Sequence, residues 1–104
     1  MPDTPIGRRA TGFLTAYNTG TDALATFIAA EMTPRDVSAP ERARRLEGTR
    51  AQTGMLTVRQ VLSASPTELT LVANGSNGGP VRMQFNADAA APFRLLGVLF
   101  LPYP

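Results

Sequence analysis

The sequence predicts an α+β domain in which three N-terminal helices pack on a curved, four-stranded antiparallel meander sheet. Apolar residues recur at helical spacing as far as Thr53, and after Gly54 the pattern becomes the alternating one of strands. The 104 residues fit one domain, residues 1–104, because a chain of this length can bury a core without metals or disulfides.

A loose arm, residues 1–5, precedes the first predicted helix, which spans Ile6–Tyr17. The apolar residues of this helix are three or four positions apart and therefore share one face. Gly12 lies inside the helix, where glycine is unfavourable, and so indicates a close neighbour. The break Asn18–Gly20 separates it from a second amphipathic helix, which ends at Thr33 because the next residue is proline.

A third helix is predicted from Pro40 to about Thr53, with Ser38 as its N-terminal cap. The connections between the later segments are short and rich in turn residues, so consecutive strands should run antiparallel. The four predicted strands are Met55–Ala64, Glu68–Asn74, Val81–Ala87 and Phe93–Leu101.

The fourth predicted strand is apolar on both faces. Leu95, Leu99 and Leu101 fall on one side, and other large apolar residues fall on the opposite side. Helices can cover only one face of such a sheet, so the other face needs a partner. We therefore predict that Leu95, Leu99 and Leu101 are exposed in the monomer and form an interface for a homodimer or for another domain.

The composition excludes several kinds of chemistry. The chain has no cysteine and no histidine, which removes thiol chemistry, the commonest general base and the commonest metal ligand. The acidic residues have no spacing typical of a metal site, so neither a metal nor a cofactor is predicted. The net charge of +2 is too small to indicate nucleic-acid binding. The longest apolar run, Leu95–Leu101, is too short to span a membrane.

The run FLTAYNTGTDALATFIAAEMTP, residues 13–34, resembles the opening of nuclear-transport-factor-2-like (cystatin-like) α+β domains. The stretches at residues 41–75 and 93–104 resemble a short variant of this family, found as an accessory domain beside bacterial serine β-lactamase-like hydrolases and tail-type peptidases. This resemblance implies a cone-shaped sheet, a non-catalytic accessory role, docking to a hydrolase domain and an extracytoplasmic location. The N-terminus lacks the apolar segment of a signal peptide, which leaves the compartment open.

An alternative implied by the resemblance is a small-ligand binder or a minor isomerase- or hydrolase-like enzyme that uses the cone. Isomerase-like relatives carry a tyrosine on the first helix and an aspartate base on the sheet, whereas the matching helix position here is Phe13. We therefore predict that the chain is not an enzyme. In a ligand-binding domain the polar contacts would be Tyr17 and Arg50. Tyr17 could equally be a core residue, and Arg50 could pair with Glu31 or Asp36.

Overall fold

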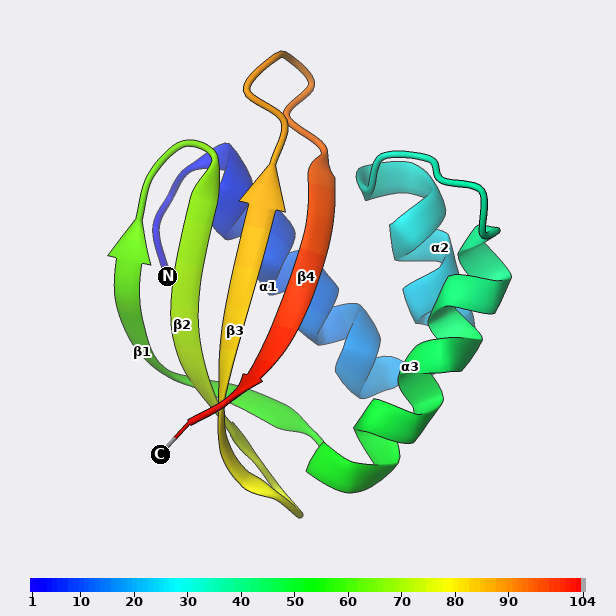
Figure 1. Cartoon of the computed structure of the whole chain (residues 1–104), viewed down its shortest axis with the longest axis vertical. Helices are drawn as coiled ribbons and strands as arrows, with labels where there is room; N and C mark the ends of the chain where they lie inside the picture. Colours follow the sequence, from blue (N-terminus) through cyan, green and yellow to red (C-terminus); the bar gives the residue numbers. More distant parts are fainter. Residues whose placement is uncertain (104) are drawn as a thin grey trace.

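The computed structural model describes residues 1–103 and has three helices followed by four strands, which confirms the predicted fold class (Figure 1). The helices are α1 (Pro5–Thr19), α2 (Thr21–Glu31) and α3 (Ala39–Thr53). The strands are β1 (Leu56–Ala64), β2 (Glu68–Gly75), β3 (Gly79–Ala87) and β4 (Leu95–Pro102). Each strand pairs antiparallel with the next, in the sheet order β1-β2-β3-β4, so that β1 and β4 are the two edges.

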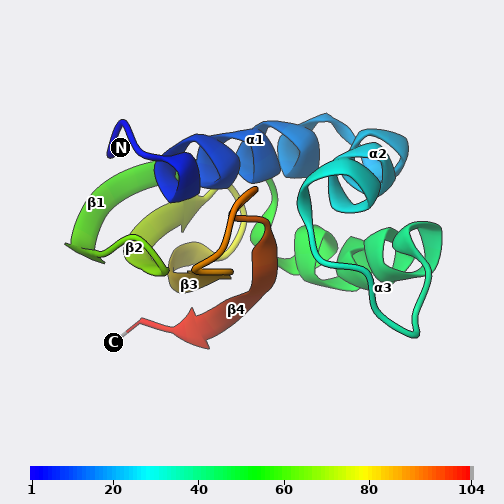
Figure 2. The ribbon, with the colours of Figure 1, turned by 90° about the horizontal axis from the view of Figure 1, so that it is seen from above.

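The helices form a second layer that reaches past one edge of the sheet. Figure 2 shows α1 lying across one face of the sheet, with α2 at its end and α3 beside β4. Helix α3 packs mainly against α2 and not against the strands. The sheet is therefore covered on one face by α1, and the space beside β4 is bounded by α2 and α3.

Local capping explains where the helices begin. The Thr4 hydroxyl accepts a hydrogen bond from the Gly7 amide at 3.2 Å, and the Ser38 hydroxyl accepts one from the Glu41 amide at 3.3 Å. Between α1 and α2, Gly20 has φ 154° and ψ 178°, which is an extended glycine conformation and not the left-handed helical one typical of helix ends.

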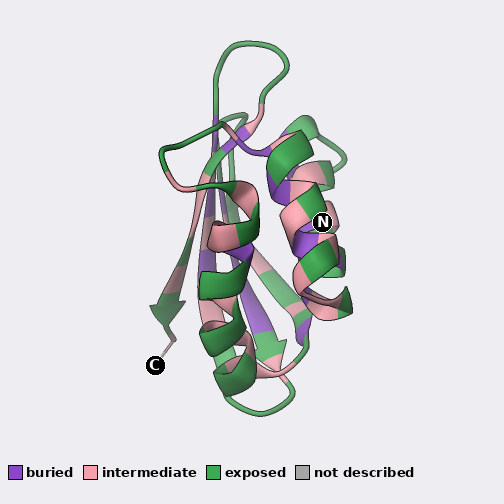
Figure 3. Cartoon of the chain, turned by 90° about the vertical axis from the view of Figure 1, so that its right-hand side faces the viewer, coloured by how far each residue is buried: buried purple, intermediate pink, exposed green. Residues whose placement is uncertain are grey.

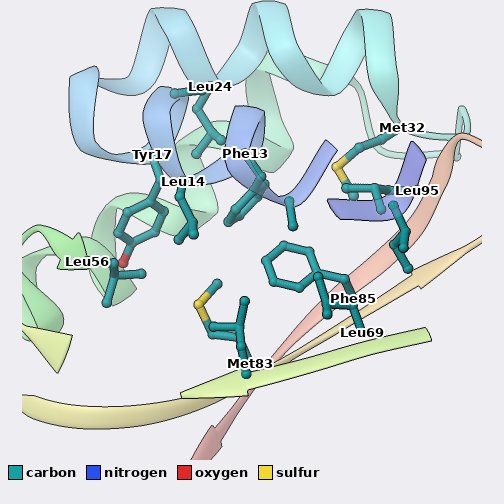
Figure 4. Close-up of a cluster of buried hydrophobic side chains, with 14 of the residues drawn as sticks. Phe13, Leu14, Tyr17, Leu24, Met32, Leu56, Leu69, Met83, Phe85 and Leu95 are labelled. Carbon is teal, nitrogen blue, oxygen red and sulfur yellow. The ribbon is translucent and has the colours of Figure 1, made fainter. Parts of the chain in front are cut away.

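The core is built on one face of α1. Buried side chains of this helix meet buried side chains of β2 and β3 (Figure 4). The Phe13 ring lies at the centre, with its centroid 5.8 Å from that of Phe85, 5.9 Å from Phe27 and 6.4 Å from Phe100. A Cβ at Gly12 would lie 2.9 Å from the Phe27 ring, which confirms the predicted close neighbour.

Asn18 fixes the end of α1 to the first strand. Its side-chain amide donates to the Leu56 carbonyl and its carbonyl oxygen accepts from the Leu56 amide, both at 2.8 Å. The side chain therefore makes the two bonds that a neighbouring strand would make with an edge residue. These two bonds hold the start of β1, an edge strand of the sheet, against the C-terminal end of α1.

The prediction that Leu95 is exposed is wrong. Ala87 pairs with Leu95 but Asn86 pairs with Gly97, so Leu96 is an extra residue that forms a bulge in β4. The bulge shifts the alternation of β4 by one position. Leu95 consequently turns into the core with 0% of its surface exposed, and Leu96 is 38% exposed.

The central position of Phe13 leads to a prediction about stability. Replacing Phe13 by alanine removes a buried ring from contacts with both layers, so Phe13→Ala should lower the free energy of unfolding by about 3–5 kcal/mol. Urea denaturation measures this change. The matched control is Leu62→Ala, at a residue 41% exposed on β1, where a change within about 0.5 kcal/mol is expected. Equal losses in the two variants would contradict a core centred on Phe13.

Candidate functional site

A cleft of about 290 Å³ lies between β4 and the α2–α3 pair. Its polar groups come from one region, formed by Arg35 in the α2–α3 connection and by Arg42 and Arg45 on α3. Strand β4 contributes the consecutive residues from Gly97 to Phe100. The apolar side chains around the cleft are Phe13, Ile28, Met32, Leu46, Val98, Leu99 and Phe100.

The position of α3 opens this cleft. Strand β4 ends the sheet, and only its first residues are covered at the free edge. There the Thr33 amide donates to the Leu95 carbonyl at 2.8 Å, and the Arg35 guanidinium donates to the Leu96 carbonyl. From Gly97 onward the strand lines the cleft. The α2–α3 connection thus closes one end of the β4 edge and leaves the rest facing the helices.

The three arginines give the cleft a positive rim. One Arg42 Nη donates to the Thr33 carbonyl at 3.3 Å, and the other lies 3.9 Å from the Met32 sulfur. Burial, together with the positive charge of Arg35, lowers the pKa of Arg42. Arg45 has one long ion pair, 3.6 Å from a Glu41 carboxylate that also pairs with Arg44. No acidic residue of the described chain, residues 1–103, lines this cleft.

Tyr17 belongs to the core and not to the cleft. Its ring is fully buried and packs 6.0 Å from Phe13 and 5.9 Å from Phe100, between centroids. Its hydroxyl lies 2.8 Å from the Thr53 hydroxyl, which itself donates to the Gly54 carbonyl at 2.9 Å. Because a threonine hydroxyl has a single proton, Tyr17 is the donor. Burial raises the pKa of Tyr17, and the positive charge of the nearby Arg50 opposes this in part.

Arg50 lies at the corner where α1 meets α2. A Cβ added to Gly20 would lie 4.0 Å from an Arg50 Nη atom, and the nearby surface hollow is formed with Glu47 and Ala51. The Glu31 carboxylate, one of the two acids considered as its partner, pairs with Arg9 at 3.0 Å. The two expected ligand contacts, Tyr17 and Arg50, therefore lie outside the arginine-rimmed cleft.

The outer face of β4 carries the other candidate surface. Leu99 is 51% exposed and Leu101 is 36% exposed. Figure 3 shows the exposed end of β4 on the side of the sheet away from α1. In the sheet register Leu101 faces Arg82 on β3, and Arg82 in turn faces Val72 on β2, which is almost fully buried. The neighbouring Leu99 faces Gln84 on β3. The exposed apolar surface of this face is therefore the pair of leucines on β4, bordered by polar side chains of β3.

Within residues 1–103, no three histidine, cysteine or acidic side chains are grouped so as to hold a metal ion. The helices described here include none that is long and apolar enough to cross a membrane.

Sequence reasoning missed the cleft. The spacing of Arg42, Arg45 and Leu46 on one predicted helix could have indicated a shared face. Arg35 lies in a connection without periodicity, and no pattern in the sequence places it beside β4.

No protein-family model, curated protein or solved structure matches this chain. The cleft and the outer face of β4 are therefore the features that bear on its function.

The raised pKa of Tyr17 predicts a pH dependence. A group with a raised folded-state pKa contributes stability that is complete below its unfolded pKa, about 10 for tyrosine, and is lost as pH rises through the folded value. The free energy of unfolding should therefore fall as the pH rises from about 10 through the alkaline range in the wild type, and should fall less in Tyr17→Phe. Urea denaturation across this range measures both slopes. A wild-type slope in Tyr17→Phe would contradict the prediction.

Proposed function

We propose that this domain is a non-catalytic interaction module that forms a homodimer through the outer face of β4. The observation that carries the proposal is the exposure of Leu99 and Leu101 on a sheet face that no helix covers. Exposed apolar residues on an edge strand are unfavourable in an isolated monomer and are typical of association surfaces. A two-fold interface would place the same leucines of both copies against each other.

The resemblance supports a wider context for this module. Short domains of the family that the sequence resembles accompany bacterial serine hydrolases, so we propose that this domain is an accessory module of such a hydrolase. In that setting the same leucines could contact the hydrolase domain in place of a second copy. The absence of histidine and cysteine from the sequence favours a binding role over a catalytic one.

A second candidate function is the binding of a small ligand, and the cleft favours it. Its volume of about 290 Å³ is close to the lower end of the range of ligand pockets, about 300–1,000 Å³. The rim supplies guanidinium groups but, among the described residues, no carboxylate that could act as a base. The arrangement therefore supports binding better than an isomerase- or hydrolase-like reaction.

The dimer proposal predicts a concentration-dependent mass. Light scattering at micromolar concentrations should show a homodimer for the wild type. Leu99→Glu places a charge in the apolar interface and should weaken association by about 30-fold or more. Circular dichroism should show that the variant remains folded, because Leu99 is half exposed in the monomer.

The matched control for this experiment is Leu62→Glu, which adds the same charge to an exposed leucine at the opposite edge of the sheet. It should leave the dimer unchanged. Should Leu99→Glu unfold, Leu101→Glu supplies the same test. A wild type that stays monomeric throughout the concentration range would overturn the homodimer.

A further inference from the structure

We infer that the cleft beside β4 binds a small amphipathic carboxylate. The apolar tail of this ligand would lie against the floor of the cleft, formed by Phe13, Ile28, Met32, Val98 and Phe100. Its carboxylate would contact the rim, formed by Arg35, Arg42 and Arg45. This inference deepens the second candidate function, ligand binding, and rests on it. It does not depend on the proposed dimer, although Leu99 borders both the cleft and the dimer surface.

The apolar side chains of the cleft floor favour an apolar ligand tail. Phe13, Ile28 and Met32 are buried side chains whose surfaces also bound the cleft, and Val98 and Phe100 of β4 are only partly buried beside them. Apolar atoms of a ligand would remove this remaining surface from water, which is favourable in proportion to the area covered. The floor therefore favours a ligand with a hydrocarbon tail.

The positive charge of the rim favours an anionic ligand group. Arg35, Arg42 and Arg45 all border the cleft. Each guanidinium has five N–H donors, whereas only one or two donors of Arg35 and Arg42 are used by backbone carbonyls and the Met32 sulfur. The lowered pKa of Arg42 has the charge of Arg35 among its causes. An anion between these groups would relieve their repulsion and use the free donors.

Shape and charge together favour a monocarboxylate over larger anions. The planar fork of arginine matches a carboxylate in a bidentate geometry. A cavity of about 290 Å³ is small for a nucleotide. The apolar side chains of the floor would also leave the hydroxyl groups of a sugar without partners, at an energetic cost. A short alkyl chain ending in a carboxylate meets each condition.

The experiment is a calorimetric titration of the whole chain with octanoate, octan-1-ol and octyltrimethylammonium, which share a tail and differ in charge. Octanoate should bind about tenfold more tightly than octan-1-ol, and octyltrimethylammonium should bind most weakly. Arg42→Gln should weaken octanoate binding about tenfold and leave octan-1-ol binding unchanged. Arg45→Gln, at a more exposed side chain, should weaken octanoate binding about threefold.

Arg59→Gln is the matched control, because it removes the same charge from an exposed arginine on β1, at the far edge of the sheet. It should leave octanoate affinity at the wild-type value. Arg42 also bonds to the backbone, so Arg45→Gln carries the test if Arg42→Gln unfolds.

Three results would overturn the inference. Equal affinities for octanoate and octan-1-ol would leave an apolar ligand site without selection for a carboxylate. Equal losses in Arg45→Gln and Arg59→Gln would assign the preference to net charge and not to the rim. Binding of none of the three probes would overturn both the carboxylate and the second candidate function. None of these results bears on the dimer, whose test away from the cleft is the light scattering of Leu101→Glu.

Discussion

The packing of Phe13 between the helices and the sheet is the interaction on which the rest of the structure depends. Its ring meets Phe27 of α2, Phe85 of β3 and Phe100 of β4 with centroids about 6 Å apart, close to edge-on for the first two. Aromatic pairs in such arrangements are favourable beyond the area that they bury. One residue of α1 thereby joins the second helix to the two strands at the β4 edge.

This packing also separates the two surfaces of β4. Phe100 turns inward to Phe13, so its neighbours Leu99 and Leu101 must point outward. The bulge at Leu96 reverses this alternation once and returns Leu95 to the core, where the α2–α3 connection bonds to it. The strand therefore presents leucines on its outer face and its free edge to the arginine-rimmed cleft.

The sequence was sufficient for the order of elements, because the change from helical to alternating periodicity at Gly54 is a local property. It was not sufficient for the orientation of Leu95, which depends on how β4 pairs with β3 and not on its own pattern. The cleft depends on α3 packing against α2, since this brings Arg42 near a loop residue, Arg35, with no periodic signal. Likewise Asn18 was expected only to help end a helix, yet it also holds the start of β1 through two hydrogen bonds.

We propose that β4 carries two distinct surfaces, an outer apolar face for a second copy and an inner-edge cleft for a small carboxylate, with Leu99 bordering both. Methyl NMR of the whole chain tests it most directly. Raising the protein concentration should shift the methyl signals of Leu101 and leave those of Ile28 and Met32 in place, whereas octanoate should do the reverse. A single set of methyl groups that responds to both, or none that responds to either, would contradict the account.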